Sequence, residues 1–229
     1  MRAAPSCLPR TAARLAVMTG NTPAVRVVPA GDCRRVRWKN NAGWTREICA
    51  CRLDGRDGVQ AQEWDWRLSI AEIEADAPFS SFPGVERELV LLSGNGLRLR
   101  FDDGECHELL PPYQRLRFSG ERALVGELVD GPTEDFNLMW RRGTVEATLW
   151  HRPLVGAMVA FVEPGETWAM HLLAGGATVG GDAHPLRLAR GDTLLLRGGT
   201  GERMRHVIDG GGEMLLVRIA ARGRAPFAA

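Results

Sequence analysis

The sequence predicts an all-β protein built from two β-barrels of similar plan. A short phrase occurs twice with the same internal spacing: Pro83-Gly84 stands six residues before Leu91-Leu92-Ser93-Gly94, and Pro164-Gly165 stands six residues before Leu172-Leu173-Ala174-Gly175. Apolar residues also alternate with polar ones in many short runs, and helical periodicity is nearly absent. Repetition at the length of a small domain indicates duplicated units, with chance similarity of two short phrases as the alternative.

Short apolar runs bounded by Gly, Pro, Asp and Asn predict the strands of the first half. The clearest run is 64–70, where large apolar side chains occupy the even positions and polar ones the odd positions. Asn95-Gly96 predicts a hairpin turn, because this pair tolerates positive φ. The other strands expected in this half are 47–53, 88–92, 97–101, 109–118 and 124–128.

A second series of strands is expected at 158–162, 171–173, 177–179, 186–188, 193–196 and 214–219. The segment 135–143 links the two halves or starts the second one. The glycine-rich stretches 198–201 and 210–212 are expected to be flexible hairpin loops, because the Lys-Ser/Thr of a phosphate-binding loop follows neither. Gly191-Asp192, placed before an apolar strand, resembles the Gly-Asp turn of cupin barrels. With the duplication, this predicts a bicupin, that is, two double-stranded β-helix (jelly-roll) barrels.

The chain of 229 residues is long enough for two small domains. We expect an N-terminal cupin barrel at 23–140 and a C-terminal one at 141–222. Residues 1–22 are expected to be a disordered leader, or to lie upstream of the true start if translation begins at Met18. Residues 223–229 are expected to be a disordered tail.

The composition argues against nucleic acid and membranes as partners. The formal net charge is +1, so no general electrostatic attraction to nucleic acid or to an anionic membrane is expected. No apolar run approaches the roughly 18 residues of a membrane span, and the first 20 residues lack the apolar core of a secretory signal. The five cysteines form no C-x-x-C motif, which favours buried thiols in a reducing cytoplasm.

No metal site, cofactor or catalytic triad is expected. No two of the five histidines are closer than 13 residues, so the H-x-H pair of metal-binding cupins is missing. His171 is predicted to be a hydrogen-bonded core residue or a residue of the barrel rim. No G-x-S-x-G motif occurs either.

Four clusters in the first half set polar residues between aromatic ones: 38–48, 64–71, 79–87 and 135–143. Their patterns are W-x-N-x-x-G-x-T-R-E-I, W-R-x-S-I-A, F-S-x-F-P-G-x-E-R and D-F-N-x-M-x-R-R, in that order. This series resembles the HutD/Ves family over about residues 35–143, and the rest of the chain follows only the general cupin pattern. The resemblance implies a bicupin fold and a link to bacterial histidine utilisation. It also implies a regulatory or protective role, with N-formylglutamate or a related intermediate as ligand.

The same clusters predict a carboxylate site in the N-terminal barrel. Arginine forms planar, two-pronged contacts with carboxylates, and Arg46 and Arg67 are the expected anchors, with Arg87 or Arg142 at the rim. The neutral polar partners expected for the ligand are Asn40, Thr45, Ser69, Ser80 and Asn137. The aromatic walls expected around it are Trp38, Trp66, Phe79 and Phe82. Glu47 would position an arginine or accept an N–H of the ligand.

Other interpretations of these residues stay open. Arg46 and Glu47 could form a plain ion pair at a strand edge. Because adjacent strand residues face opposite sides, the two side chains cannot both point into one barrel unless a bulge intervenes. Arg67 faces either solvent or a polar barrel interior, and we expect the interior. Each tryptophan could belong to the core rather than to a ligand site. Trp44 stands where the family more often has a smaller or polar residue, and could cover the pocket.

We therefore expect a cytoplasmic protein that binds a small carboxylate and regulates histidine utilisation, rather than an enzyme. The alternative is a metal-independent enzyme that acts on an acyl amino acid, with Glu47 as the general base. A third possibility is a homodimer that forms through uncovered edge strands.

Overall fold

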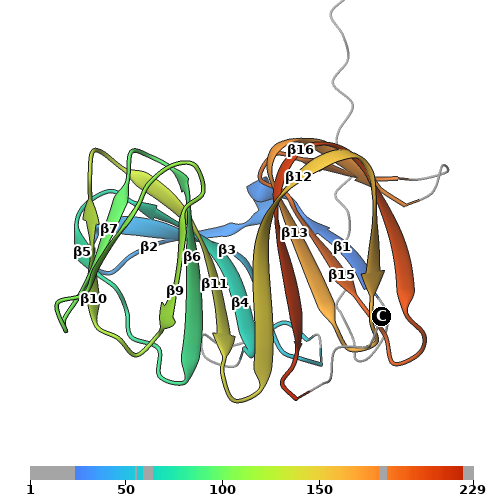
Figure 1. Cartoon of the computed structure of the whole chain (residues 1–229), viewed down its shortest axis with the longest axis horizontal. Helices are drawn as coiled ribbons and strands as arrows, with labels where there is room; N and C mark the ends of the chain where they lie inside the picture. Colours follow the sequence, from blue (N-terminus) through green and yellow to red (C-terminus); the bar gives the residue numbers. More distant parts are fainter. Residues whose placement is uncertain (1–23, 55, 59–63, 181–184, 224–229) are drawn as a thin grey trace, which may run out of the picture.

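The computed structural model describes residues 24–54, 56–58, 64–180 and 185–223. Most of the expected leader and tail, 1–23 and 224–229, lies outside these ranges. The described residues form sixteen strands and one short 3₁₀ helix, Ala30–Asp32, which confirms the all-β prediction. Figure 1 shows the strands gathered in two halves, side by side. None of the described helical segments is long and apolar enough to cross a membrane.

The N-terminal half contains two sheets. The larger sheet has the strand order β2 (Arg34–Arg37), β3 (Gly43–Cys51), β4 (Trp66–Ile73), β11 (Thr133–Arg141), β6 (Val85–Ser93) and β9 (Arg115–Ser119). The smaller sheet has the order β5 (Ala77–Pro78), β10 (Leu124–Leu128), β7 (Leu97–Phe101) and β8 (Cys106–Leu109). Leucine and phenylalanine side chains fill much of the space between them.

The C-terminal half is one sheet with the order β1 (Ala24–Val28), β15 (Thr193–Arg197), β13 (Thr167–Val179), β16 (Met204–Ala221) and β12 (Val145–Val162). A sixth strand, β14 (Leu186–Ala189), pairs with the end of β13. Strands β12 and β16 stay paired over eighteen residues and curl over at the top of Figure 1. Through this curl, one part of each strand faces the N-terminal half and the other part encloses a separate apolar core.

The two large sheets share a strand order that accounts for the sequence repeat. The run β4-β11-β6-β9 in one sheet matches β12-β16-β13-β15 in the other, in chain order as well as in space. The repeated phrases enter the equivalent strands β6 and β13. Gly84 and Gly165 precede these strands with φ of 76° and 71°, a left-handed conformation that glycine adopts without steric cost. The repeat therefore marks equivalent positions in two related sheets.

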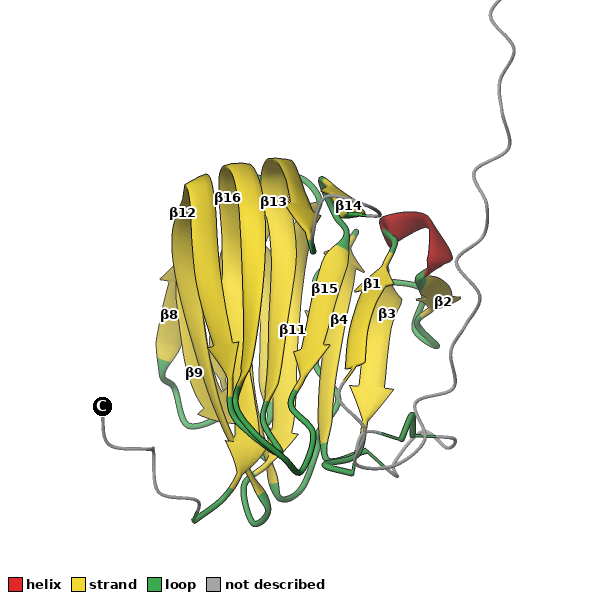
Figure 2. Cartoon of the chain, turned by 90° about the vertical axis from the view of Figure 1, so that its right-hand side faces the viewer, coloured by secondary structure: helices red, strands yellow, loops and turns green. Residues whose placement is uncertain are grey.

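The large sheets pack face to face between the halves, lying next to each other in Figure 1 and one in front of the other in Figure 2. Side chains from both sheets form one shared core, with Leu68 and Phe136 on one side and Leu149 and Leu215 on the other. Strand alternation makes this possible, because Trp66, Leu68 and Ile70 of β4 all point toward the C-terminal half. The opposite face of β4 is then left to line the interior of the N-terminal half.

Several strand predictions differ from the structure. The strands expected at 171–173 and 177–179 are one strand, β13, with a register shift between Leu172 and Ala174. The segment 109–118 is broken by a turn that contains the cis peptide bond Pro111-Pro112. Gly210–Gly212 is not a loop but part of β16, where side chains at Gly210 and Gly212 would collide with the carbonyl oxygens of β13.

One chain segment belongs to a different half from the one expected, and one of the two roles considered for another segment is excluded. The segment 135–143 does not start the second half, because β11 lies between β4 and β6 in the N-terminal sheet. Residues 24–28, expected in the N-terminal barrel, form β1, which pairs along its whole length with β15 of the C-terminal sheet. The first described strand thus closes the edge of the second half.

Candidate functional site

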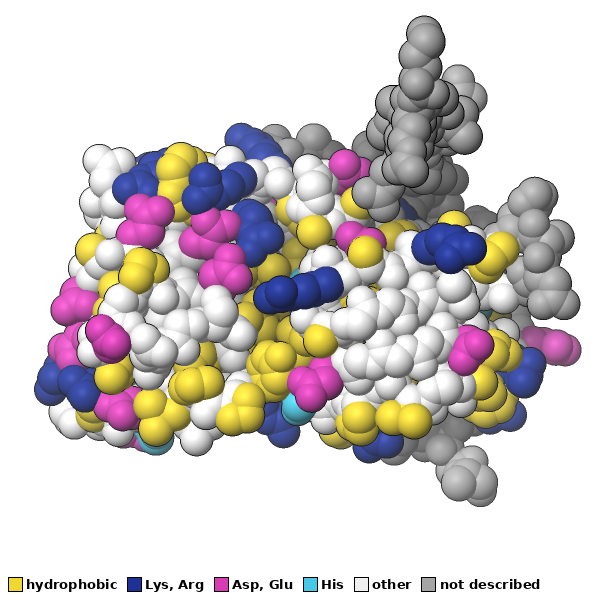
Figure 3. All heavy atoms as spheres, turned by 90° about the horizontal axis from the view of Figure 1, so that it is seen from above, with side chains coloured by type: hydrophobic (Ala, Val, Ile, Leu, Met, Phe, Trp, Pro, Cys, Tyr) yellow, Lys and Arg dark blue, Asp and Glu magenta, His cyan; other side chains and the backbone are white. Residues whose placement is uncertain are grey.

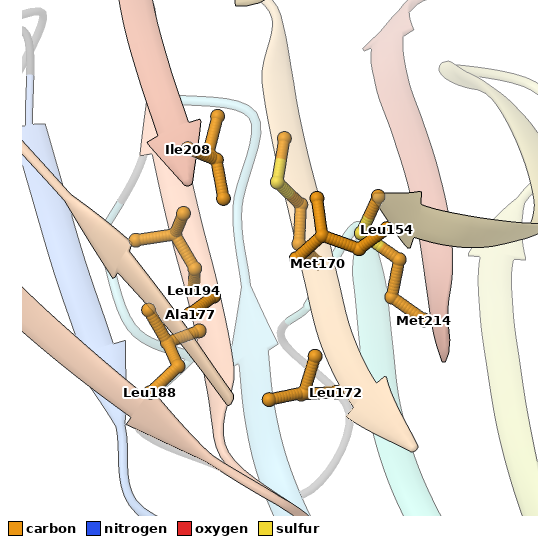
Figure 4. Close-up of a pocket in the computed structure, with 8 residues that line it drawn as sticks. All are labelled: Leu154, Met170, Leu172, Ala177, Leu188, Leu194, Ile208 and Met214. Atoms are coloured by element: carbon orange, nitrogen blue, oxygen red, sulfur yellow. The ribbon is translucent and has the colours of Figure 1, made fainter. Parts of the chain in front are cut away.

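The two halves differ in what their interiors hold. In the C-terminal half, apolar side chains converge and leave a space of only about 10 Å³ (Figure 4). The residues around it are Leu154, Met170, Leu172, Ala177, Leu188, Leu194, Ile208 and Met214. This interior is a packed core with no polar side chain around its remaining space, so it offers no group to orient a polar ligand.

The N-terminal half instead encloses a cavity of about 600 Å³, within the range of small-molecule sites. Strands β3, β4, β6 and β11 line it together with the segments that follow β2 and β5. Its lining residues are Arg37, Trp38, Lys39, Asn40, Thr45, Arg67, Ser69, Ala71, Pro78, Phe79, Ser80, Phe82, Arg87, Asn137 and Met139. We call this space the N-terminal cavity. It brings together all the residues expected at the ligand site except Arg46, Glu47, Trp66 and Arg142.

The turn between β2 and β3 builds one corner of the cavity and explains the first sequence pattern. The Trp38 indole N–H donates to Thr45 Oγ1 at 2.8 Å, and the side chain of Asn40 accepts from the Ala42 amide at 3.1 Å. Trp38 lies directly over Gly43, because a Cβ at that position would stand 3.2 Å from the indole ring. The spacing of tryptophan, asparagine, glycine and threonine thus fixes the aromatic wall against β3.

Arg67 faces the barrel interior, as expected, and is held by Glu47. Its Nε donates to Glu47 Oε2 at 2.8 Å across the β3–β4 pair. Glu47 does not line the cavity itself, and its carboxylate orients Arg67 toward it. Because this hydrogen bond uses Nε, the two terminal nitrogens of Arg67 are left to meet an anion.

Arg87 is a buried cation in an aromatic box. Its side chain is only 5% exposed, and its guanidinium carbon lies 5.2 Å from the ring centres of Phe79 and Phe118 and 5.7 Å from that of Phe82. Burial lowers the pKa of Arg87 to about 10, with the charge of Asp135 opposing and that of Arg67 adding to this shift. The group is still charged at neutral pH, and its Nε has no hydrogen-bond partner among the described residues.

Asp135, which is absent from the predicted ligand set, is the most unusual group of this half. It is fully buried on the face of β11 that also carries Asn137 and Met139. Burial raises its pKa to about 7, Arg87 opposes the shift, and Glu134 adds to it. The sequence does hold a signal for Asp135, because it lies two residues before Asn137 and strand alternation puts both on one face. Arg37, Lys39 and Met139 also line the cavity without having been predicted.

Three residues that were expected to contact the ligand, Arg46, Trp66 and Arg142, lie outside the cavity. Arg46 points to the opposite face of the sheet, where it binds Glu72 and Glu134 and makes no pair with Glu47. Trp66 belongs to the core between the halves, consistent with its core interpretation. Arg142 bonds to Ser119, Glu121 and the carbonyl oxygen of Val85, and so braces the turn before β6.

Trp44 does not cover the pocket. It lies on the far face of β3, under the guanidinium groups of Arg35 and Arg37 at 3.9 and 4.7 Å. Its indole N–H donates to Glu74 at 3.1 Å. The departure from the family pattern at this position therefore leaves the cavity open.

His171 is a hydrogen-bonded core residue, one of the two roles expected for it. Its Nδ1 lies 2.9 Å from Thr193 Oγ1, and its ring packs against Phe136 with centres 5.3 Å apart. Burial lowers its pKa to about 4, and the charge of Arg46 contributes in the same direction. Within the described ranges, no group of three or more His, Cys, Asp or Glu side chains is placed to hold a metal ion.

Charges of both signs are mixed on the outer surface. Figure 3 shows Lys and Arg side chains beside Asp and Glu side chains over the N-terminal half. Many of them are paired, such as Arg98 with Glu108 at 2.7 Å and Arg100 with Glu127 at 2.7 Å. Arg67 and Arg87 therefore differ from the cations of this surface in lining the cavity and being largely buried.

Sequence comparisons match most of the chain to a known family. A family model described as HutD matches residues 30–216. A Pseudomonas putida protein, described as an uncharacterized 21.2 kDa protein in the hutC 3′ region, is 39% identical over 116 residues, which are 51% of this chain and 58% of that protein. Protein Ves of Escherichia fergusonii is 39% identical over 111 residues, 48% of this chain and 54% of that protein. The matches span little more than half of these relatives.

Comparison of this chain with solved structures points to the same family. HutD from Pseudomonas fluorescens superposes with a TM-score of 0.72 at 30% identity, covering 87% of this chain and all of that one. Oxalate decarboxylase from Lactobacillus farciminis superposes with a TM-score of 0.57 at 8% identity, covering 84% of this chain and 85% of that one. The second likeness shows a shared cupin-like fold and nothing beyond it.

Proposed function

Because the chain belongs to the HutD family, which is related to histidine utilisation, we propose that it binds a small carboxylate in the N-terminal cavity and regulates that process. N-formyl-L-glutamate is the candidate ligand. One observation carries the proposal: two inward-facing guanidinium groups, Arg67 and Arg87, line a cavity of about 600 Å³, whereas the apolar core of the other half leaves a space of only about 10 Å³.

The chemistry of the lining supports an anion of this kind. Arg67 offers its terminal nitrogens, Arg87 is held among aromatic rings, and Lys39 at the exposed end forms no ion pair with a described residue. Charge-assisted hydrogen bonds gain strength in such a low-dielectric enclosure. Thr45 and Ser80 add neutral polar groups that an amide or a second carboxylate can use.

The proposal is tested by isothermal titration of N-formyl-L-glutamate into the wild-type protein and the Arg67→Ala variant. We expect saturable binding to the wild type, and an affinity for the variant at least about tenfold lower, because one charged hydrogen bond is worth about 1.5–3 kcal/mol. Arg98→Ala is the matched control, because Arg98 is an exposed arginine of β7 outside the cavity. Absence of binding to folded wild-type protein, or unchanged binding to Arg67→Ala, would contradict the proposal.

The regulatory part is tested in cells. If ligand binding in the cavity controls histidine utilisation, a chromosomal Arg67→Ala substitution should change the expression of the utilisation genes on histidine as a deletion of the gene does. The Arg98→Ala strain should behave as the wild type. If the Arg67→Ala strain expresses these genes as the wild type does, with the protein present at its usual level, then ligand binding in the cavity does not control histidine utilisation.

A further inference from the structure

Acceptor oxygens that no described protein group satisfies lie in the wall of the N-terminal cavity, at Asn137, and directly beside that wall, at Asp135. Both carboxylate oxygens of Asp135 and the side-chain oxygen of Asn137 are buried without a hydrogen-bond partner among the described residues. Asp135 is 0% exposed and Asn137 is 7% exposed. A buried acceptor without a donor costs about 1–3 kcal/mol, so three of them side by side indicate that something else supplies the donors.

The sheet places these oxygens at the cavity. Strand β11 lies between β4 and β6, with Asn137 opposite Ser69 and Asp135 opposite Ala71 on β4. Ser69 and Ala71 both line the cavity, as does Asn137 itself. Directly opposite residues on one face of an antiparallel pair have Cβ atoms about 5 Å apart. Asp135 therefore stands at the inner end of the same wall, next to the lining residues.

The arginines do not satisfy these acceptors. Arg87 acts on Asp135 through its charge, with no hydrogen bond between them. Arg67 is committed through Nε to Glu47, and the terminal Nη1 of Arg87 reaches the carbonyl oxygen of Ser80 at 3.4 Å. The cavity thus presents donors for an anion and, separately, acceptor oxygens at Asn137 and beside it at Asp135.

We propose that Asp135 and Asn137 form a subsite that accepts an N–H group, so that the cavity selects N-acylated amino acids over carboxylates that lack this donor. This inference rests on the proposed function, because it assumes that a carboxylate occupies the arginines. A neutral amide N–H fits better than an ammonium group, since Arg87 and Arg67 repel a further positive charge at this wall. The carboxylate of the ligand meets the arginines while its amide N–H meets Asp135 and Asn137.

The test compares two ligands that differ only in the donor. N-formyl-L-glutamate and its ester analogue 2-formyloxyglutarate have the same outline, but an oxygen replaces the N–H in the ester. Isothermal titration of both into the wild type should give at least about a tenfold preference for the amide, because the ester leaves the acceptors unsatisfied and sets its own oxygen against them. The Asp135→Asn variant should lose part of this preference, because an NH2 donor replaces one of the two acceptor oxygens and the charge of the acceptor is removed.

Two further variants keep the test decisive. Glu108→Gln is the control, because Glu108 lies on β8 outside the cavity and pairs with Arg98; its preference should equal that of the wild type. If Asp135→Asn does not fold, Asn137→Ala carries the same expectation of a reduced preference. The ratio of the affinities for amide and ester reports on recognition of the N–H group, because substitution of a purely structural residue would weaken the binding of both ligands equally.

The outcomes separate this inference from the proposed function. Equal affinity of the wild type for amide and ester would overturn the N–H subsite while leaving carboxylate binding intact. An unchanged preference in folded Asp135→Asn and Asn137→Ala would also overturn it. Binding of neither ligand would overturn both proposals.

Discussion

Two buried charged residues of the N-terminal half, Arg87 and Asp135, lie at or beside the cavity and form no ion pair with each other. Arg87 and Asp135 are both almost fully enclosed, yet neither hydrogen-bonds to the other. Burying an ion without a close partner is costly, and a residue in this state raises the free energy of the unliganded protein. A ligand that supplies the missing partners would recover part of that cost, so stability and binding should be linked at these residues.

The first prediction at this scale concerns pH. The pKa of Asp135 is raised from an ordinary 3.8 to about 7 by burial, so between these values the folded protein binds its proton more tightly than the unfolded chain does. This contribution to stability is present at low pH and is lost as pH rises toward 7. As the pH rises toward 7, the free energy of unfolding of the wild type should therefore fall relative to that of Asp135→Asn, by up to about 1.4 kcal/mol per pH unit.

The measurement is urea unfolding of both proteins between pH 4.5 and 8. Comparing the variant with the wild type cancels the effect of His171, whose lowered pKa acts with the opposite sign. The His171 contribution is present above the ordinary pKa of 6.5 and is lost as pH falls toward 4. Parallel stability curves for the two proteins would show that Asp135 ionises normally in the folded state.

At the residue scale, the sequence predicts residue types better than orientations. Arg67 and Arg46 lie in matching patterns, but only Arg67 faces the cavity, because strand alternation from Thr45 leaves Arg46 on the other side. Asp135 was not predicted as a ligand-binding residue, because a carboxylate is not expected to bind an anion. Its importance follows from complete burial, and burial depends on which strands pack around β11.

At the scale of elements, the turn between β2 and β3 couples a strand pair to the cavity wall. Gly43 begins β3 opposite Ile73, and the backbone of Glu72 passes very close to it. A side chain here would meet both β4 and the indole of Trp38. The glycine of the first pattern thus allows the tryptophan to lie flat on the strand.

We predict that Gly43→Ala destabilises the protein and disturbs this wall. The added Cβ would stand 2.3 Å from the carbonyl oxygen of Glu72, so β3 or β4 must shift. We expect a loss of at least about 1 kcal/mol in the free energy of unfolding, which lowers Tm by roughly 2–4 °C in a chain of this size. Differential scanning calorimetry measures it, with Gly143→Ala as the control because open space surrounds that position. An equal effect of both substitutions would argue against the close contact.

Most individual strands could be predicted, but not how they join. The strands expected at 97–101 and 124–128 have the bounds observed, because clear turn signals flank them. The two short strands expected around Gly175 are one, because the close approach of β16 to β13 requires glycine there for space rather than for a turn. Such contacts between distant segments leave no periodic signal in the local sequence.

At the scale of the whole molecule, the core between the large sheets makes the two halves dependent on each other. Leu138 is fully buried in this shared core, and residues of β12, β13 and β16 complete it from the other side. Neither large sheet would cover this face alone. We therefore expect the halves to unfold together in one transition.

Leu138→Ala tests this dependence. Removing a fully buried leucine should cost about 2–5 kcal/mol, and the loss should reach both halves. Hydrogen exchange should speed up in β13 and β16 as well as in β4 and β11. Val155→Ala, at a position 87% exposed, should change stability by less than about 0.5 kcal/mol. Faster exchange confined to the N-terminal half would show that the halves are independent.

The pairing of β1 with β15 has a consequence for synthesis on the ribosome. Of the described strands, β1 leaves the exit tunnel first, but its only strand partner among them, β15, is made after thirteen others. At about 5–20 residues per second, β1 waits on the order of ten seconds or longer with both edges bare. The C-terminal sheet therefore cannot close at this edge before β15 has been made. A nascent chain arrested before β15 would present an unpaired strand to chaperones and to neighbouring chains.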